Sequence, residues 1–425
     1  MIHIGNTDTL SSNSAQAFAL TENNLYTVEA MQEYFDHLSP GGVLDLSRPY
    51  RLVGDEALRL TVLALEALRQ RGVAQPERNV VVVLGRNILG ELTGTVLIRL
   101  RPWTSPELAR LRTLARQRGA GVAYAPGGPY QLEWAQLARS RSPAAYYSSY
   151  RLNVCAPTDD KPFFFEMRRL GDFGSLGPGY IYAADPFLVL LVTFAMLLVL
   201  SLALVLAPLL LTARRDRPPL GSLGFFAAIG LGFLTLEITL IQRFELFLGF
   251  PTYALSVVLF ALLIWTGSGS LLAGQVRNPR RALTSALAVA CVLMATSAFE
   301  LRPLLAALIG LPFAARILVT VGLLAAGGSR WEWPCPLASG DSPRCTPRGV
   351  AWAWGVNGIA SVVASAGAIT VAIVTGFPIA TLVALLCYLG ALAHVRLSAW
   401  PQPARHASRP PATITEPQSS SPATT

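Results

Sequence analysis

Long apolar runs dominate the second half of the chain. They cover approximately residues 186–212, 221–241, 252–274, 282–299, 304–326, 350–374 and 377–395. A helix needs about 20 apolar residues to cross the hydrocarbon core of a bilayer, and the first run contains no charged residue. The pattern predicts an all-α polytopic membrane domain of about seven helices over residues 186–397, embedded in a lipid bilayer.

Residues 1–150 follow a different pattern, in which short apolar strands alternate with amphipathic helices. Strands are predicted at residues 2–4, 43–46, 79–84, 95–100 and 121–124. Helices are predicted at residues 27–38, at 56–71, and from Ser105, read as the helix cap, to Gly119. This alternation predicts an α/β layer domain. A connector over residues 151–185 follows it, and a Pro/Ser/Thr-rich tail over residues 398–425 is expected to be disordered.

Arginine is distributed unevenly between the two ends of the predicted spans. One end carries twelve arginines, at positions 214, 215, 217, 277, 280, 281, 330, 344, 348, 396, 405 and 409. The other end carries only Arg243 and Arg302. The positive-inside rule assigns the arginine-rich end to the cytoplasm. With seven spans, residues 1–185 are then expected outside.

Composition supports a membrane protein and argues against a nucleic-acid partner. Charged residues make up 14% of the chain, against about 25% in soluble domains. The net charge of +9 comes from scattered arginines, with Lys161 as the only lysine. No cleavable signal peptide is evident at the N-terminus. Cys335 and Cys345 share one loop and could pair or bind a metal, although no second CxxC or histidine cluster accompanies them.

Several motifs fall in the predicted α/β domain, the connector and the spans. The first strand is followed by Asn-Thr-Asp-Thr at 6–9, then by Leu-Tyr-Thr-Val-Glu at 25–29 and by Ser-Pro-Gly-Gly at 39–42. The connector carries Pro-Thr-Asp-Asp-Lys-Pro-Phe-Phe at 157–164. Three further motifs lie in the membrane half, around Gly230–Phe244, Phe250–Leu255 and Trp352–Gly358.

These motifs resemble those of the spermidine synthase branch of the S-adenosylmethionine methyltransferase-like superfamily. The closer resemblance is to multi-pass bacterial membrane proteins of a spermidine synthase-like group, and it covers most of residues 1–395. It implies a partial Rossmann-like (methyltransferase-like) domain at residues 1–150 and a place in the bacterial inner membrane. It also implies a transferase that uses S-adenosylmethionine or its decarboxylated form and acts on a small polyamine-like ligand.

The sequence departs from the family pattern at two places. The family's Gly-rich cofactor loop and ribose-binding acid lie upstream of the motif with which this chain starts, so the cofactor-binding half is expected to be absent. The Gly-x-Gly motifs at Gly230 and at Gly267 lie inside apolar runs and are interpreted as sites of close helix packing. In the acidic loop, the first family acid is replaced by Gly5, which leaves Asp8 as the candidate catalytic residue. Asp8 could bind a cationic amine or could simply cap the loop.

Other polar residues admit two interpretations each. Asp159 and Asp160 could form a metal or amine site, or a turn that docks the connector. Glu237, an acid within a span, could face the bundle interior and pair with Arg243 or Arg316, or could lie near the membrane interface. Asn357 is interpreted as an interhelical hydrogen-bonding residue. Tyr26 and Glu29 match family helix positions but also suit a core aromatic and a first-turn acid.

Two functions remain open. The first is a transferase, or the remnant of one, that uses an S-adenosyl donor whose binding site this chain lacks. The second is a non-catalytic membrane transporter or scaffold whose front domain binds a ligand or a partner. An external front domain argues against the first, because S-adenosyl donors are cytoplasmic metabolites.

Overall fold

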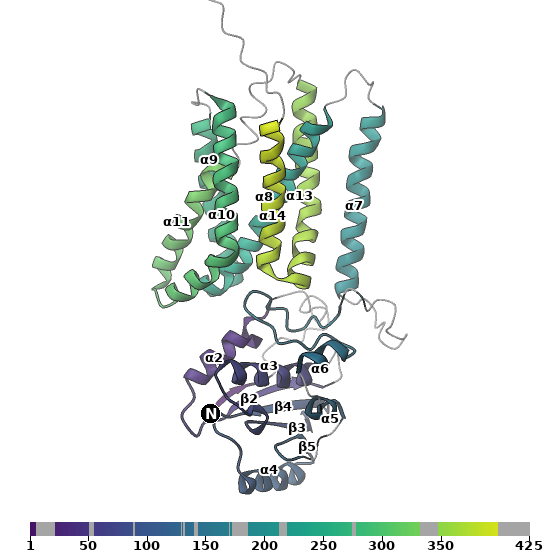
Figure 1. Cartoon of the computed structure of the whole chain (residues 1–425), viewed down its shortest axis with the longest axis vertical. Helices are drawn as coiled ribbons and strands as arrows, with labels where there is room; N and C mark the ends of the chain where they lie inside the picture. The colour runs from purple at the N-terminus through teal and green to yellow at the C-terminus, as the bar shows by residue number, and fades with distance from the viewer. Residues whose placement is uncertain are drawn as a thin grey trace, which may run out of the picture.

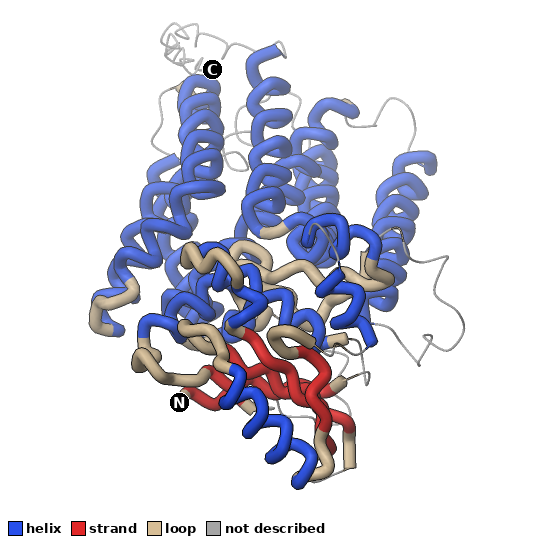
Figure 2. Tube along the Cα trace, turned by 60° about the horizontal axis from the view of Figure 1, so that its bottom comes forward, coloured by secondary structure: helices blue, strands red, loops and turns tan. Residues whose placement is uncertain are grey.

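The computed structural model describes residues 1–5, 22–50, 55–87, 90–128, 130, 132–139, 143–169, 171, 186–211, 219–273, 278–331 and 347–397. An α/β domain contacts one end of a bundle of long helices that run side by side (Figures 1 and 2). We call this end of the bundle the near end and the opposite end the far end.

The α/β domain is built on one five-stranded mixed sheet with the order β1-β2-β4-β3-β5. Its strands are β1 (Ile2–Ile4), β2 (Leu44–Pro49), β3 (Val80–Arg86), β4 (Leu92–Ile98) and β5 (Gly121–Tyr124). The β1 and β2 strands pair in parallel, whereas the pairs β2–β4, β3–β4 and β3–β5 are antiparallel. Only a short loop separates β3 from β4, and such a loop can join only antiparallel neighbours.

Alternation along the strands gives the sheet two apolar faces. Val80 and Val82 belong to the main core, which includes α2 (Val28–Asp36) and α3 (Glu56–Gln70). Val81 lies on the other face and packs in a smaller core with Leu108 of α4 (Ser105–Gln117). The helices α5 (Leu132–Arg139) and α6 (Pro143–Ser149) complete the domain. Figure 1 shows α2, α3 and α6 between the sheet and the bundle, with α4 on the far side of the sheet.

The predicted α/β elements are confirmed, with shifts of a few residues at their ends. The capping residue of α4 was predicted wrongly. Thr104, not Ser105, is the N-cap, because its side chain and Glu107 form a reciprocal capping box. Thr27 similarly caps α2 by accepting from the backbone N–H of Ala30.

The bundle makes the chain a multi-pass membrane protein. Among the described residues, six helices are long and apolar enough to cross a bilayer. A seventh, α11 (Phe313–Trp331), has a shorter apolar stretch, Phe313–Ala325. The other six are α7 (Pro186–Leu211), α8 (Leu220–Leu248), α9 (Pro251–Ala273), α10 (Pro279–Leu308), α13 (Pro347–Thr375) and α14 (Phe377–Leu397).

The α11 helix runs parallel to α9. The rings of Phe313 and Tyr253, near the start of each helix, are 5.0 Å apart. Further along, Trp265 Nε1 donates to the carbonyl of Val321 at 3.0 Å. The α11 helix thus extends from the near end toward the far end beside a helix that meets the criteria for a span.

The far end gathers arginines, as the sequence pattern predicts. Arg280, at the start of α10, donates to the carbonyl of Arg396, at the end of α14, at 3.2 Å. The boundaries of the fourth and fifth spans were predicted wrongly, because Pro303 lies inside α10 rather than between two helices. The helices α8 and α10 extend further toward the α/β domain than expected, so that Arg243 and Arg302 lie within helices.

Candidate functional site

A polar cluster joins the α/β domain to the near end of the bundle. It contains three acids, Glu29 of α2 with Asp159 and Asp160 of the connector, and two arginines, Arg243 of α8 and Arg302 of α10. We call these five residues the junction cluster. It is the most extensive set of charged contacts between the two parts of the chain that the structure describes.

The acids are positioned by a tight turn and by the start of a helix. Thr158 and Lys161 form an isolated β-bridge that closes the turn around Asp159 and Asp160. The Thr27 hydroxyl donates to Asp159 Oδ1 at 2.6 Å. The Asp159 backbone N–H donates to Glu29 Oε2 at 2.9 Å. The connector turn and the first turn of α2 therefore form one unit before the bundle contributes any contact.

Arg302 spans the acids of this unit. Its Nη2 lies 2.5 Å from Glu29 Oε1 and 3.9 Å from Asp159 Oδ2. Its Nη1 lies 3.5 Å from Asp160 Oδ2. A planar guanidinium can offer several N–H groups at once, which suits a site with three carboxylates.

Arg243 completes the cluster from within the bundle. Its Nη2 lies 3.2 Å from Asp160 Oδ1 and donates to the carbonyl of Ala298 at 3.0 Å. Its Nη1 donates to the carbonyl of Ser297 at 2.5 Å. The side chain of Arg243 is only 6% exposed, so it links α8, α10 and the connector in a buried position.

The connector also docks on the loop between α13 and α14. Lys161 Nζ donates to the carbonyl of Val374 at 2.5 Å, and the Phe377 backbone N–H donates to the carbonyl of Asp160 at 2.9 Å. Gly376 has a φ of +94°, and a Cβ there would lie 2.9 Å from the Asp160 oxygen. Phe163 packs edge-on against Phe377, with ring centroids 5.9 Å apart.

On its other side the connector is fixed by a buried arginine. Arg59 of α3 donates to the carbonyls of Cys155, Phe163, Phe164 and Glu166. Burial lowers the pKa of Arg59 to about 10, and nearby acidic groups oppose that shift. Arg59 therefore remains charged at neutral pH and donates to four connector carbonyls, three of them in buried contacts.

Burial also changes the acid–base properties of the connector. It raises the pKa of Asp159 to about 6, with the Thr27 hydrogen bond and Arg302 opposing the shift and Glu29 and Asp160 reinforcing it. Burial lowers the pKa of Lys161, and the charge of Arg59 adds to this effect. In the folded chain Asp159 therefore binds a proton more readily than an ordinary aspartate does.

The contacts of the junction cluster hold the connector and α2 against the bundle. Its three acids are each within 4 Å of an arginine nitrogen. No group of three or more potential metal ligands occurs in the described part of the chain. Of the two interpretations of Asp159 and Asp160, the docking turn is the one that these contacts match.

The other predicted site residues are only partly brought together. Asp8 lies outside the described residues, as do Cys335 and Cys345. Arg316 donates to the carbonyl of Phe247 at 2.8 Å and thereby ties α11 to the end of α8. Glu237 is half-buried in α8, and its pairing with Arg243 or Arg316 stays a prediction. Tyr26 is fully buried and accepts a hydrogen bond from Arg48 at 3.2 Å.

The two Gly-x-Gly motifs inside apolar runs were interpreted as sites of close helix packing. This is confirmed for the motif at Gly230 and wrong for Gly267 of the other motif. A Cβ on Gly230 would overlap the carbonyl of Asn357 and lie 2.9 Å from its Oδ1. A Cβ on Gly232 would lie 2.7 Å from the Tyr388 ring. Gly267, by contrast, has no neighbour within 4 Å, because it is exposed on α9. The Oδ1 atom of Asn357 is buried with no hydrogen-bond partner among the described residues, and an interhelical hydrogen bond from its side chain stays a prediction.

Sequence reasoning missed Arg302 and Arg59 as organising residues. A signal for Arg302 was present, since Arg243 and Arg302 are the two arginines on the arginine-poor end. An arginine at the end of the spans that otherwise lacks arginine is a candidate for binding an acid elsewhere in the chain. Arg59 has no comparable signal, because an arginine in an amphipathic helix normally faces solvent.

Comparisons with known proteins add no identification. Neither a family model, nor a curated protein, nor a solved structure matches this chain.

Proposed function

We propose that this chain is an inner-membrane protein of the spermidine synthase-like group whose α/β domain is a non-catalytic cap on a helical bundle. The observation that supports the proposal is that the three acids of the junction cluster are already paired with arginines of the bundle. Glu29, which matches a family helix position, and the connector acids Asp159 and Asp160 bind Arg302 and Arg243 of the bundle. Carboxylates held in this way are poorly placed to bind and deprotonate an attacking amine.

A scaffold role is favoured by the number of independent attachments. The connector is held by the junction cluster, by the α13–α14 loop and by Arg59 of α3. These contacts fix the α/β domain to four membrane helices, α8, α10, α13 and α14. A domain attached in this way is suited to present a surface or to brace the near ends of the helices.

Ligand titration tests the proposal directly. Purified full-length protein is titrated by calorimetry with S-adenosylmethionine and, separately, with its decarboxylated form. We expect no heat of binding up to millimolar ligand, while a soluble spermidine synthase titrated with the same decarboxylated donor gives a normal isotherm. Saturable binding to this chain in the micromolar range would overturn the non-catalytic assignment.

A transferase remnant is the second candidate, and one observation favours it. The β1–α2–β2 unit is parallel, with the Pro-Gly-Gly turn immediately before β2, as the resemblance implies for a methyltransferase-like domain. A labelled aminopropyl donor incubated with putrescine and the full chain tests this candidate. Label appearing in spermidine would support it, and the proposed cap predicts none.

A further inference from the structure

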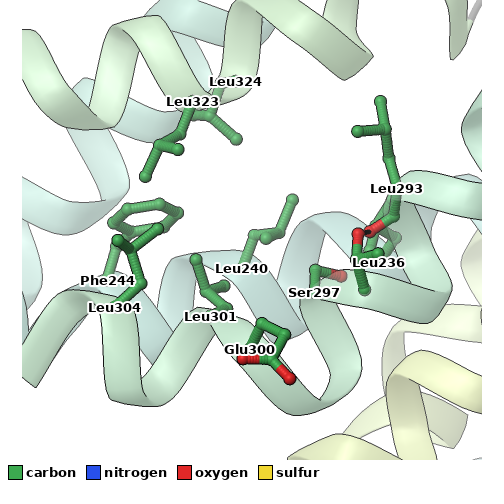
Figure 3. A pocket seen from close by; sticks show the side chains of 11 residues that line it. Leu236, Leu240, Phe244, Leu293, Ser297, Glu300, Leu301, Leu304, Leu323 and Leu324 are labelled. Atoms are coloured by element: carbon green, nitrogen blue, oxygen red, sulfur yellow. Dashed lines mark hydrogen bonds between the residues drawn. The ribbon is translucent and has the colours of Figure 1, made fainter.

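An apolar cavity lies between α8, α10 and α11 at the near end of the bundle. It has a volume of about 160 Å³, which is room for on the order of ten water-sized groups. Figure 3 shows leucine side chains and Phe244 around a common space, with Glu300 at its edge. The lining residues are Leu236, Leu240, Phe244, Leu293, Thr296, Ser297, Glu300, Leu301, Leu304, Leu323 and Leu324.

The cavity lies at the lipid-facing surface of the bundle. Leu240 and Phe244 form its floor and are almost fully buried, whereas Leu304 and Leu323 are 41% and 37% exposed. In a bilayer, an apolar side chain exposed on a spanning helix faces acyl chains. The natural material to fill an apolar cavity in this position is therefore hydrocarbon from the adjacent leaflet.

Glu300 lies in the last third of α10, on the side of the bundle near the α/β domain. It precedes Arg302 of the junction cluster by two residues, and its neighbour Phe299 is 64% exposed. Arg302 in turn binds acids of the α/β domain and the connector, outside the bundle, so Glu300 lies toward the end of α10 that meets the α/β domain.

Glu300 also lacks a partner among the described residues. Its side chain is exposed and forms no hydrogen bond or ion pair there. The two hydroxyls of the cavity are satisfied within α10, since Thr296 donates to the carbonyl of Val292 and Ser297 to that of Met294. The cavity therefore combines an apolar interior with one exposed carboxylate that has no partner in the described part of the chain.

We propose that this cavity binds an aminophospholipid of the near leaflet, with an acyl chain between α8, α10 and α11 and the headgroup ammonium on Glu300. Phosphatidylethanolamine has the required chemistry, because its primary ammonium can pair with a carboxylate while its chain fills the apolar space. The inference is independent of the proposed function, since it concerns a face of the bundle that the α/β domain does not occupy.

Native mass spectrometry of lipid retention tests the proposal. The full chain is reconstituted in an equal mixture of phosphatidylethanolamine and phosphatidylglycerol, extracted in mild detergent and measured with its retained lipids. We expect the wild-type protein to retain one phosphatidylethanolamine preferentially. Glu300→Gln should reduce the preference for phosphatidylethanolamine about fivefold, the change that ~1 kcal/mol of ion pairing produces, without abolishing lipid retention.

Cavity-filling variants separate the chain site from the headgroup site. Leu240→Trp fills the floor and Leu304→Trp fills the mouth, where a larger side chain is easily accommodated in the fold. Both should lose the retained lipid, whereas Leu386→Trp, at a position 66% exposed on α14, should behave like the wild type. Retention that persists in a folded Leu304→Trp protein would overturn the cavity assignment. Equal retention of both lipids by the wild type would overturn the headgroup assignment.

Discussion

At the scale of single residues, Arg302 is the side chain on which the junction cluster depends. It contacts all three acids of the cluster, from a helix that is distant in sequence from each of them. Its side chain is 37% exposed, so solvent screens each ion pair and limits its contribution. The stabilisation it provides therefore comes from the shared geometry more than from any one contact.

A double-mutant cycle measures this contribution. Arg302→Ala and Glu29→Ala should each destabilise the protein, and the double variant should be less destabilised than the sum. We expect a coupling free energy of about 1 kcal/mol, as for other partly exposed pairs. Thermal unfolding in detergent provides the measurement. Arg281→Ala, an exposed site on the same helix, is the control and should be neutral. Strict additivity of the two substitutions would contradict the pairing.

Asp159 should make the stability of the protein depend on pH. Its pKa in the folded chain is about 6, above the ordinary value of 3.8. The folded state therefore binds the proton more tightly than the unfolded state, and this residue stabilises the fold progressively as the pH falls from about 6 toward about 4. Asp159→Asn retains an oxygen that can accept from Thr27 and removes the titration.

The measurement compares melting temperatures across this pH range. The wild-type protein should gain stability relative to Asp159→Asn as the pH is lowered, with the change spread between about pH 6 and about pH 4. Glu33→Gln, an exposed acid on α2, serves as the matched control. A difference between Asp159→Asn and the wild type that is constant with pH would show that burial does not raise the pKa of Asp159.

At the scale of elements, the contact between α8 and α13 depends on the absence of a side chain at Gly230. The Asn357 backbone occupies the space that a Cβ would need, and Ser361 Oγ approaches the Gly230 carbonyl at 3.3 Å. Small residues allow this approach, and close packing is a main source of helix association in a bilayer.

Gly230→Ala should force α8 and α13 apart. We expect a destabilisation of about 1–3 kcal/mol, the usual range for overpacking a well-packed interface. Gly224→Ala on the same helix is the matched control, because nothing lies within 4 Å of a Cβ there, and it should be neutral or slightly stabilising. Thermal unfolding of both variants distinguishes them. Equal stability of the two would mean that the helices separate at no cost.

The sequence predicted individual elements well because their signals are local. The β5 strand and the start of α3 lie where the pattern of apolar residues places them, since period and capping depend on near neighbours. The helix ends near Arg243 and Arg302 were missed because the prediction ended each span where its uncharged apolar run ends. The α8 helix instead continues to Leu248, where Gly249 in the left-handed region caps it, and α10 continues through Pro303 to Leu308.

At the scale of the whole molecule, the α/β domain lies on the arginine-poor end of the bundle. Arg243 and Arg302 are engaged by acids of that domain and of the connector, while Arg280 and Arg396 lie together at the far end. The charge asymmetry along the sequence thus corresponds to two chemically different ends of the folded protein. By the positive-inside rule, the α/β domain should lie outside the cytoplasm.

Labelling of Cys155 tests this orientation. Cys155 is exposed in the connector, whereas Cys291 is buried within the bundle. In a variant with Cys335 and Cys345 replaced by serine, a membrane-impermeant maleimide should label Cys155 in intact spheroplasts. The further substitution Cys155→Ser should abolish the signal. Labelling that requires lysis of the cells would place the domain in the cytoplasm and reopen the transferase assignment.

The ion pair between Glu29 and Arg302 has a consequence for biogenesis. Its two residues are 273 positions apart in the chain. At a synthesis rate of about 5–20 residues per second, roughly 15 to 55 seconds pass between the emergence of the first and of the second. During that interval the α/β domain has to remain soluble without its membrane partner, while the translocon inserts four helices. Final docking is therefore a late step, and the connector acids are exposed to chaperones and proteases until α10 has been inserted.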